Sequence, residues 1–270
     1  MKAAHLSDRG VIRGSGPETR AYLQGLVTGN AVTLEPGEAR WAALLTPQGK
    51  ILFDFLMSAD GEAILLDVKR AQVADLLKRL ALYRLRAKVE LCDESDKWGV
   101  IALFGGPVGE GARDSRHPDL GARLLVAADE VAATLTTFGG DAGAETYHSH
   151  RIALGVPEGG LDFVYGDAFP HEADMDQLNG VDFKKGCFVG QEVVARMQYR
   201  GTTRSRVVRV RIEGEAPAPG APVLAGEKPA GVMGSSANGF GLALLRLDRA
   251  EEAAQAGDKL ISGGAVLTLV

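Results

Sequence analysis

The stretch FKKGCFVGQEVVAR, residues 183–196, holds one of the two cysteines of the chain among residues that suit chemistry. Lys184 and Lys185 precede Cys187, and Gly186 and Gly190 flank it. Nearby ammonium groups stabilise a thiolate, as does the N-terminus of a helix that begins just after the thiol. The glycines would let the backbone approach a ligand closely. Free cysteine is also often buried. Packing, a ligand-facing or redox-sensitive thiol, and a nucleophile therefore all stay open for Cys187.

A second candidate is Asp54, which lies within the apolar run ILFDFLM. A carboxylate among hydrophobic neighbours is costly unless another group pairs with it. Strand alternation places Asp54 on one face with Leu52 and Leu56. It could lie on the wet face of an edge strand, or it could receive hydrogen bonds from a bound heterocycle. The residues alone leave both interpretations open.

Four further polar residues lie close to the Cys187 motif in the sequence. Glu172 follows a proline in FPHEADMD and could cap a short helix, although two nearby aspartates compete for that role. Gln191 and Glu192 follow Gly190, where an acid complements a helix N-terminus. Arg196 comes four residues after Glu192, and such a pair supports a helix by about 0.3 kcal/mol.

The other polar residues argue against a metal centre. None of the five histidines stands at a zinc-ligand spacing from a cysteine. Two cysteines are fewer than the four thiolates that usually hold an iron–sulfur cluster within one chain. The sequence therefore predicts no metal site within one chain and leaves open only a cluster shared between subunits.

Charge is unevenly distributed along the 270 residues. The formal net charge is −5. In contrast, residues 184–211 contain eight basic residues and one acid, Glu192. This excess indicates either a strand face balanced by acids from elsewhere or a site for an anionic ligand. A nucleic-acid-binding module that uses these arginines is also conceivable, but the overall charge and the lack of an aromatic-rich RNA-binding signature argue against it.

The chain has no apolar run long enough to cross a bilayer and no apolar signal region at its start. Two cysteines cannot form a disulfide framework. We therefore expect a cytoplasmic protein, or one of an organelle matrix if a presequence was removed. Neither a membrane nor a nucleic acid is expected as a partner.

The elements that must position these residues follow from periodicity. Turn signals and alternating apolar residues predict a hairpin over residues 40–57 and strands at 62–68, 87–93, 98–104 and 123–127. Helical spacing predicts helices at 17–26, 71–85, 131–138 and 146–154, and the glycine-rich stretch 105–121 predicts a loop. This order favours an α+β architecture, and no nucleotide-binding glycine motif is present. Short strands after the Pro-rich stretch EAPAPGAP predict a separate β-barrel over 203–270, after a first region of 1–202.

Two segments, RIALGVPEGGLDF and FPHEADMDQLNGVDFKKGCFVGQEVVARMQYRG, closely resemble the signature of the YgfZ group of folate-binding proteins. This group is related to the glycine-cleavage T-protein, an aminomethyltransferase. The core K-G-C-[FY]-x-G-Q-E is specific, and it matches from Lys185 to Glu192. Weaker similarity in SGPETRAYLQGLVTGN and LLTPQGKILFDFLM extends the resemblance over nearly the whole chain.

The resemblance implies a ring-like fold of two interleaved lobes with a C-terminal β-barrel, and tetrahydrofolate or a one-carbon derivative in a central channel. Relatives of the T-protein carry a paired Asp-Asp in the hairpin, whereas here Phe53 stands beside Asp54. The implied catalytic residues are Asp54 and Cys187. The implied cofactor-binding residues are Asp54, Glu172, Lys185, Gly186, Cys187, Gly190, Gln191, Glu192 and Arg196.

The function implied by the resemblance is that of a folate-binding accessory factor for the assembly or repair of iron–sulfur enzymes. Its partners would be a folate, with or without a polyglutamate tail, and iron–sulfur client or assembly proteins. The lysines before Cys187 would attract that acidic tail. The alternative is a folate-dependent aminomethyl or one-carbon transferase, although the missing second aspartate counts against aminomethyl transfer.

Overall fold

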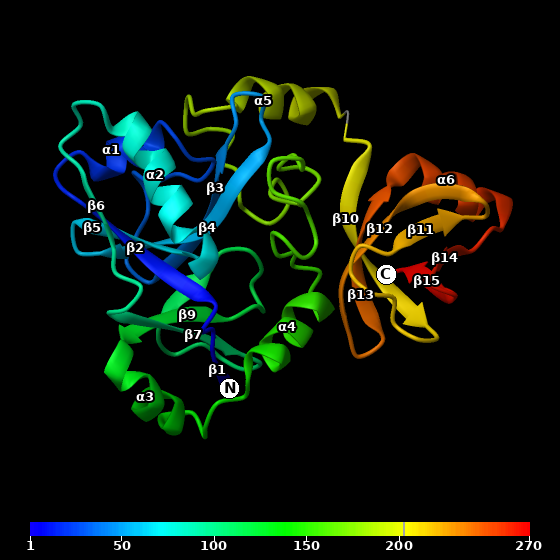
Figure 1. Ribbon diagram of the computed structural model, residues 1–270, viewed down its shortest axis with the longest axis horizontal. Coiled ribbons are helices and arrows are strands. Elements are labelled where there is room, and N and C mark those ends of the chain that lie inside the picture. Colours follow the sequence, from blue (N-terminus) through cyan, green and yellow to red (C-terminus); the bar gives the residue numbers. More distant parts are fainter. Residues whose placement is uncertain (202) are drawn as a thin grey trace.

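The computed structural model describes residues 1–201 and 203–270. The first 130 residues contain a nine-stranded sheet with the order β1-β7-β9-β8-β3-β4-β5-β2-β6 (Figure 1). Neighbouring strands are antiparallel except for β3 and β8. The strands are β1 Lys2–His5, β2 Arg9–Ser15, β3 Glu38–Leu45, β4 Ile51–Asp60, β5 Ala63–Lys69, β6 Glu90–Asp93, β7 Trp98–Phe104, β8 Ala112–Asp114 and β9 Ala122–Ala127.

The β3–β4 hairpin lies at the centre of this sheet. Its turn closes through Gly49, whose positive φ of 83° suits a residue without Cβ. Asp54 pairs in register with Ala43. Because β4 has β3 on one side and β5 on the other, Asp54 does not lie on an edge strand, and that interpretation is wrong.

Alternation along the hairpin gives each face of the sheet its own core. Ala42 and Phe55 face one side, where helices α1 Thr19–Gln24 and α2 Val73–Arg84 pack. Trp41 and Leu56 face the other side, against the segment 163–188 and helix α5 Gln191–Arg200. The sheet is thus buried on both faces at this hairpin, which explains why its strands read as nearly continuous apolar runs.

The remaining helices of this region cover the β1–β7–β9 end of the sheet. They are α3 Val131–Thr137 and α4 Ala144–Ala153, and short 3-10 turns η1 Arg70–Gln72 and η2 Ala128–Glu130 precede α2 and α3. The short helix expected after Glu172 is absent from the described residues, which form successive turns there. None of the described helices combines the length and apolar composition needed to span a bilayer.

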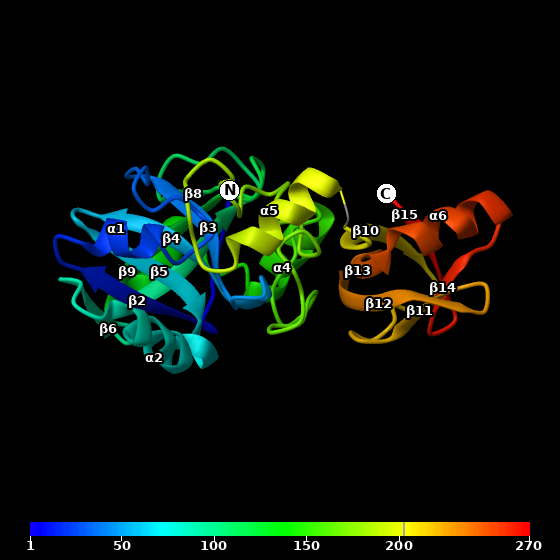
Figure 2. The same cartoon turned by 90° about the horizontal axis from the view of Figure 1, so that it is seen from above.

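The end of the chain forms a closed barrel with the order β10-β13-β12-β11-β14-β15 (Figure 2). Its elements are β10 Ser205–Glu213, β11 Pro222–Ala225, β12 Lys228–Ala237, β13 Phe240–Arg246, α6 Leu247–Ala256, β14 Leu260–Ser262 and β15 Ala265–Leu269. The barrel has its own apolar core, centred on residues such as Val210 and Leu245. The α+β architecture with a C-terminal barrel is confirmed.

Candidate functional site

Asp54 is buried and fully engaged with protein donors. Its residue surface is 8% exposed, the indole Nε1 of Trp41 donates to Oδ2 at 2.9 Å, and the Tyr165 hydroxyl donates to Oδ1. Burial and the charge of Asp54 raise the pKa of Tyr165, so the phenol stays protonated and keeps donating. The segment above the carboxylate approaches closely at Gly159, where a Cβ would lie 2.7 Å from Asp54 Oδ1. This position therefore needs glycine.

Asp54 forms no ion pair within the described residues, but its charge acts on Arg9, and through Arg9 it belongs to a group of charged side chains that we call the central network. Arg9 pairs with Asp67 at 2.6 Å, and Arg123 bridges Asp67 at 3.2 Å and Asp114 at 3.7 Å. The network contains as many cations as carboxylates, so its formal charge is zero. Its members are Arg9, Lys69, Arg116, Arg123 and Arg151 with Asp54, Asp67, Asp114, Glu158 and Asp162.

Glu158 is the carboxylate that joins several of these cations. It lies 3.3 Å from Arg151 Nε and 3.4 Å from Lys69 Nζ. Burial opposes its ionisation, but Arg151 and the neighbouring Arg9 outweigh that effect and hold the pKa of Glu158 at about 2. Burial lowers the pKa of the adjacent His148, whose Nδ1 accepts a hydrogen bond from Arg151 Nε at 3.0 Å. Glu158 is therefore an anion and His148 a neutral ring at neutral pH.

The same network holds the barrel against the sheet region. Arg151 is fully buried on α4 and pairs with Asp162 at 2.7 Å. The other oxygen of Asp162 accepts from the backbone N of Ser235 at 2.7 Å and from its hydroxyl at 2.6 Å. Gly234 must lack a side chain because a Cβ there would lie 2.4 Å from Asp162 Oδ1. Strand β12 is thus anchored directly to the central network.

Residues 183–190, which we call the Cys187 segment, lie at the surface, and neighbouring residues fix their backbone. Cys187 is exposed, which contradicts the packing interpretation, whereas the next residue, Phe188, is buried. Lys185 turns inward, where its Nζ donates to the carbonyls of Val27 and Gly29, the latter at 2.7 Å. Burial lowers the pKa of Lys185 to about 8. Its ammonium therefore holds the backbone after α1 and does not extend towards a ligand tail.

The two glycines of the motif have different structural roles. A Cβ on Gly190 would lie 2.5 Å from the carbonyl oxygen of Thr46, so this glycine lets the segment touch the β3–β4 turn. Gly186 faces open space, and its φ of 95° is the reason for a glycine there. The close approach at Gly190 is thus to the backbone of the hairpin turn, and an approach of either glycine to a ligand stays a prediction.

The other predicted site residues are spread over this surface. Glu172 accepts from the backbone N of Phe169 at 2.8 Å and so closes a turn. Gln191 is half-buried, and Glu192 and Arg196 are exposed on α5. Among the described residues, no hydrogen bond or ion pair joins the Cys187 segment to Asp54. The structure thus separates the predicted site into a buried part and an exposed part.

The basic stretch 184–211 is balanced only in part. Arg206 on β10 pairs with Asp174 at 2.6 Å and with Asp176 at 2.8 Å. These are acids brought from elsewhere, as one interpretation of the stretch required. Arg196 and Arg211 are exposed and form no ion pair within residues 1–201 and 203–270.

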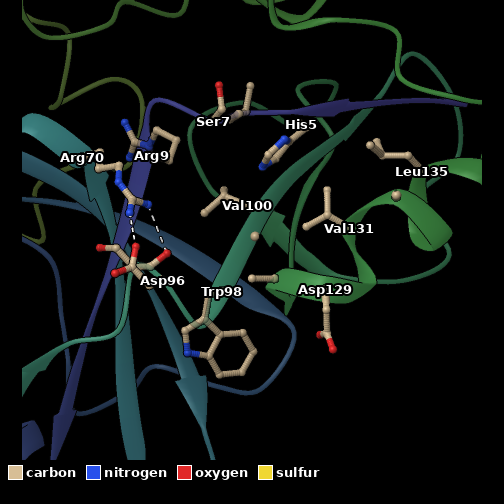
Figure 3. Close-up of a pocket in the computed structure, with 15 residues that line it drawn as sticks. His5, Ser7, Arg9, Arg70, Asp96, Trp98, Val100, Asp129, Val131 and Leu135 are labelled. Atoms are coloured by element: carbon tan, nitrogen blue, oxygen red, sulfur yellow. Dashed lines mark hydrogen bonds and ion pairs between the residues drawn. The ribbon is translucent and has the colours of Figure 1, made fainter.

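A cavity of about 610 Å³ lies beside the central network (Figure 3). Arg9 and the Arg70–Asp96 ion pair line one side, and apolar residues that include Val100 and Leu135 line the other. Arg9 thus contacts both the cavity and the central network. Over the described chain, no group of three or more His, Cys, Asp or Glu residues is placed to hold a metal ion.

Sequence reasoning missed most of the central network. Arg151, Glu158 and Asp162 all lie in RIALGVPEGGLDF. This motif carries part of the family resemblance, but none of its residues was predicted as a site residue. Charged residues inside an otherwise apolar and glycine-rich motif were the available signal. Arg9 and Tyr165 carry no comparable signal, because only the fold brings them to Asp54.

Comparisons with known proteins extend over the whole chain. Residues 204–270 match the family "CAF17, C-terminal beta-barrel domain". The aminomethyltransferase T of the glycine cleavage system from Bartonella henselae aligns with a TM-score of 0.78 at 16% identity, over 100% of this chain and 84% of that one. This likeness confirms the predicted aminomethyltransferase-type fold.

Two relatives share more of the sequence. The Neurospora crassa protein named "Iron-sulfur cluster assembly factor IBA57 homolog, mitochondrial" is 30% identical over 80% of this chain and 55% of its own length. The Mus musculus protein named "Iron-sulfur cluster assembly factor IBA57, mitochondrial" is 32% identical over 89% of this chain and 76% of its own. The chain spans little more than half the length of the fungal relatives. The identity to the mouse protein, together with the barrel match, shows that the chain belongs to the IBA57/CAF17 family, the YgfZ type.

Proposed function

We propose that the protein binds tetrahydrofolate, or a one-carbon derivative, and acts as an accessory factor in the assembly or repair of iron–sulfur enzymes. The observation that carries the proposal is the exposed Cys187 thiol. Its segment contacts, through Gly190, the turn of the hairpin that carries the buried Asp54. The names of the fungal and mouse relatives support the iron–sulfur part. Folate binding is assigned to residues 1–202, and the barrel of 203–270 supports that region.

Tetrahydrofolate fits the donors and acceptors around Asp54. Each Asp54 oxygen accepts one hydrogen bond from the protein, and a carboxylate oxygen can accept a second. The N–H groups of a pterin could supply those second donors. Tyr165 is half-buried and adds aromatic surface at the same point, whereas Trp41 is fully buried and acts through its indole N–H alone. When bound, the folate would supply a carrier for a one-carbon unit.

The acidic tail of a folate would need cations outside the balanced central network. Lys185 is engaged with backbone carbonyls, so the exposed Lys184 and Arg196 are the groups of the motif that remain for this role. Gln191 and Glu192 at the start of α5 lie between them in sequence. The proposal therefore assigns the tail to the protein surface near Cys187 and the ring to Asp54.

Calorimetric titration of the full chain with tetrahydrofolate, without oxygen, tests the folate part. We expect saturable binding and a stabilisation of about 2.7 kcal/mol when the ligand is at 100 times its Kd. Asp54→Asn should weaken binding at least about tenfold, which corresponds to 1.4 kcal/mol. Asp60→Asn, at the exposed end of the same strand, is the matched control and should bind normally. Absence of binding to the wild-type protein would remove the folate part.

Complementation in cells that lack the native protein tests the iron–sulfur part. Cys187→Ala should fold normally yet fail to restore the activity of iron–sulfur enzymes, because the change removes only an exposed thiol. Cys92→Ala, at the other exposed cysteine, should restore them. Full restoration by Cys187→Ala would show that the thiol is not needed.

The alternative, a folate-dependent aminomethyl or one-carbon transferase, is favoured by the burial of Asp54 beside two donors, an arrangement able to polarise a bound ring. It predicts turnover of an aminomethyl or formaldehyde donor in the presence of tetrahydrofolate. A large loss of that turnover in Asp54→Asn would support it. Intact folate binding without turnover would leave the accessory role.

A further inference from the structure

One end of helix α2 and the residues that follow it form an exposed surface of cations and leucines, which we call the basic–leucine surface. Leu82 is 64% exposed and Leu85 is 89% exposed. All its cations are exposed as well. The members of the basic–leucine surface are Lys78, Arg79, Leu82, Arg84, Leu85, Arg86 and Lys88.

The cations of this surface are not neutralised by the protein. No acid occurs in the sequence between Asp75 and Glu90. Within the residues that the structure describes, none of these five cations takes part in an ion pair. Glu18 accepts from the backbone N of Lys88 at 2.7 Å, so this acid is engaged with the main chain. A chain of net charge −5 thus keeps a strongly positive surface here.

Leu85 adopts a conformation that leucine rarely takes. It follows the last residue of α2 with a φ of 46° and a ψ of −107°, at a position where glycine is the usual residue. Such a backbone costs a non-glycine residue on the order of 1–2 kcal/mol. That cost is not offset by burial, because the side chain is in solvent. A strained and exposed leucine among cations indicates a surface made to contact something else.

The position of the surface fits docking without obstruction of the candidate site. Helix α2 packs through Val73 and Leu76 on the face of the sheet that also holds Phe55. Helix α5 packs through Val194 on the opposite face. The two helices accordingly lie on different sides in Figure 2. A partner on the basic–leucine surface would leave Cys187 accessible.

We propose that the basic–leucine surface docks the protein on the surface of an anionic lipid bilayer. Leucine beside Lys and Arg is the composition of interfacial lipid-binding helices. A cluster of four to eight cations is typical of recognition of anionic lipids. A protein-binding hot spot would share the arginines but would favour tryptophan or tyrosine over leucine, and a single-strand nucleic-acid site would favour aromatic residues for stacking.

This proposal departs from the expectation that no membrane is a partner. That expectation rested on the lack of a spanning segment, whereas docking needs only an exposed face. Residues 71–85 were predicted to form a helix from the spacing of their apolar residues. The apolar side of this helix packs inward at Val73, Leu76 and Leu80. Leu82 and Leu85 fall outside that apolar side, and the fold leaves them in solvent.

Sedimentation of the full chain with vesicles tests the proposal. We expect binding to vesicles of phosphatidylserine mixed with phosphatidylcholine, weaker binding as salt rises, and none to phosphatidylcholine alone. The variant Lys78→Glu/Arg86→Glu should bind at least about tenfold more weakly, since each cation contributes about 1 kcal/mol near such a surface. The matched control Arg211→Glu/Lys228→Glu removes two exposed cations of the barrel and should bind as wild type.

Leu85→Gly isolates the apolar contribution without a folding defect. Glycine suits the φ of 46°, so the variant should unfold no more easily than the wild type but bind vesicles several-fold more weakly. Equal vesicle binding by Leu85→Gly, together with tight binding of soluble glycerophosphoserine, would reassign the site to a free headgroup and overturn docking. Binding to a DNA duplex or to an acidic protein, with none to anionic vesicles, would also overturn it.

Discussion

The central network and the Cys187 segment place polar groups in opposite environments. In the network, cations and carboxylates are paired inside the protein, and Asp54 has a donor on each oxygen. At the Cys187 segment the backbone is tied down by Lys185 and Phe188, but the thiol lies in solvent. A ligand at the buried carboxylate would therefore have to join existing hydrogen bonds, whereas a partner protein would meet the thiol without rearrangement.

The largest effect is expected where a buried pair is broken. Arg151→Met removes the cation that Asp162 and Glu158 share, and it leaves two buried carboxylates poorly compensated. The free energy of unfolding in urea should fall by about 3–5 kcal/mol. Arg249→Met is the control, because Arg249 pairs with Glu252 at the surface, and its effect should stay within about 0.5 kcal/mol. Similar losses in both variants would contradict the central role of Arg151.

The attachment of the Cys187 segment to the hairpin can be tested by two alanines. Gly190→Ala should lower the free energy of unfolding by about 2–4 kcal/mol, since strain at a φ of 80° adds to a clash with Thr46. Gly186→Ala meets open space and should cost about 1–2 kcal/mol from backbone strain alone. Urea unfolding measures both values. If the two variants were equally stable, contact with the turn would not be what requires glycine at 190.

A smaller and pH-dependent effect is expected where the barrel strand β10 meets the first region. Burial raises the pKa of Asp174 to about 6 from 3.8, with a further contribution from Asp176, although Arg206 opposes the rise. The folded state therefore holds a proton between these pH values that the unfolded state has released. The free energy of unfolding should thus decrease as pH rises through this window, on the order of 2 kcal/mol from this group.

Asp174→Asn removes that titration. The variant should lose this part of the pH dependence, so that the wild type gains stability relative to it as pH falls below about 6. Urea unfolding at several pH values checks the expectation. Parallel profiles for the two proteins would show that Asp174 titrates alike in the folded and unfolded states.

The smallest effect on stability is expected at the thiol itself. Cys187→Ala should change the free energy of unfolding by less than about 0.5 kcal/mol, because the side chain is exposed. In a Cys92→Ser background, a thiol-reactive dye should label Cys187 in the native protein as fast as in the unfolded one. Strong protection from the dye would place the thiol in the interior and remove the contrast with the central network.

Local patterns predicted most elements of the first region. Turn-forming residues at Thr46–Gly49 predicted the hairpin, which the structure shows as β3 and β4. Helical spacing predicted a helix over residues 71–85, which begins two residues before α2 and ends one residue after it. Strand β8 was missed, because Ala112–Asp114 lies in a glycine-rich stretch and pairs only through tertiary contacts. The expected helix after Glu172 fails because Asp174 adopts a positive φ of 57°, which a right-handed helix does not accommodate, and the segment continues as turns.

The candidate site was predictable only where a single segment carries it. One motif singled out the thiol and its glycines, but it left open whether the thiol is exposed, and the partners of Lys185 and Gly190 lie on distant segments. The environment of Asp54 depends on Trp41 and Tyr165, which come from separate elements. The sequence indicated that the carboxylate needs a partner, but the identity of that partner depends on tertiary packing.

The equal numbers of positive and negative groups in the central network have a consequence for how the protein responds to ionic strength. A neutral interior shielded from solvent offers mobile ions little to screen. Added salt should accordingly act on the outside of the molecule, above all on the uncompensated cations that follow α2. Contacts made there would weaken in concentrated salt while the attachment of the barrel through Asp162 persists.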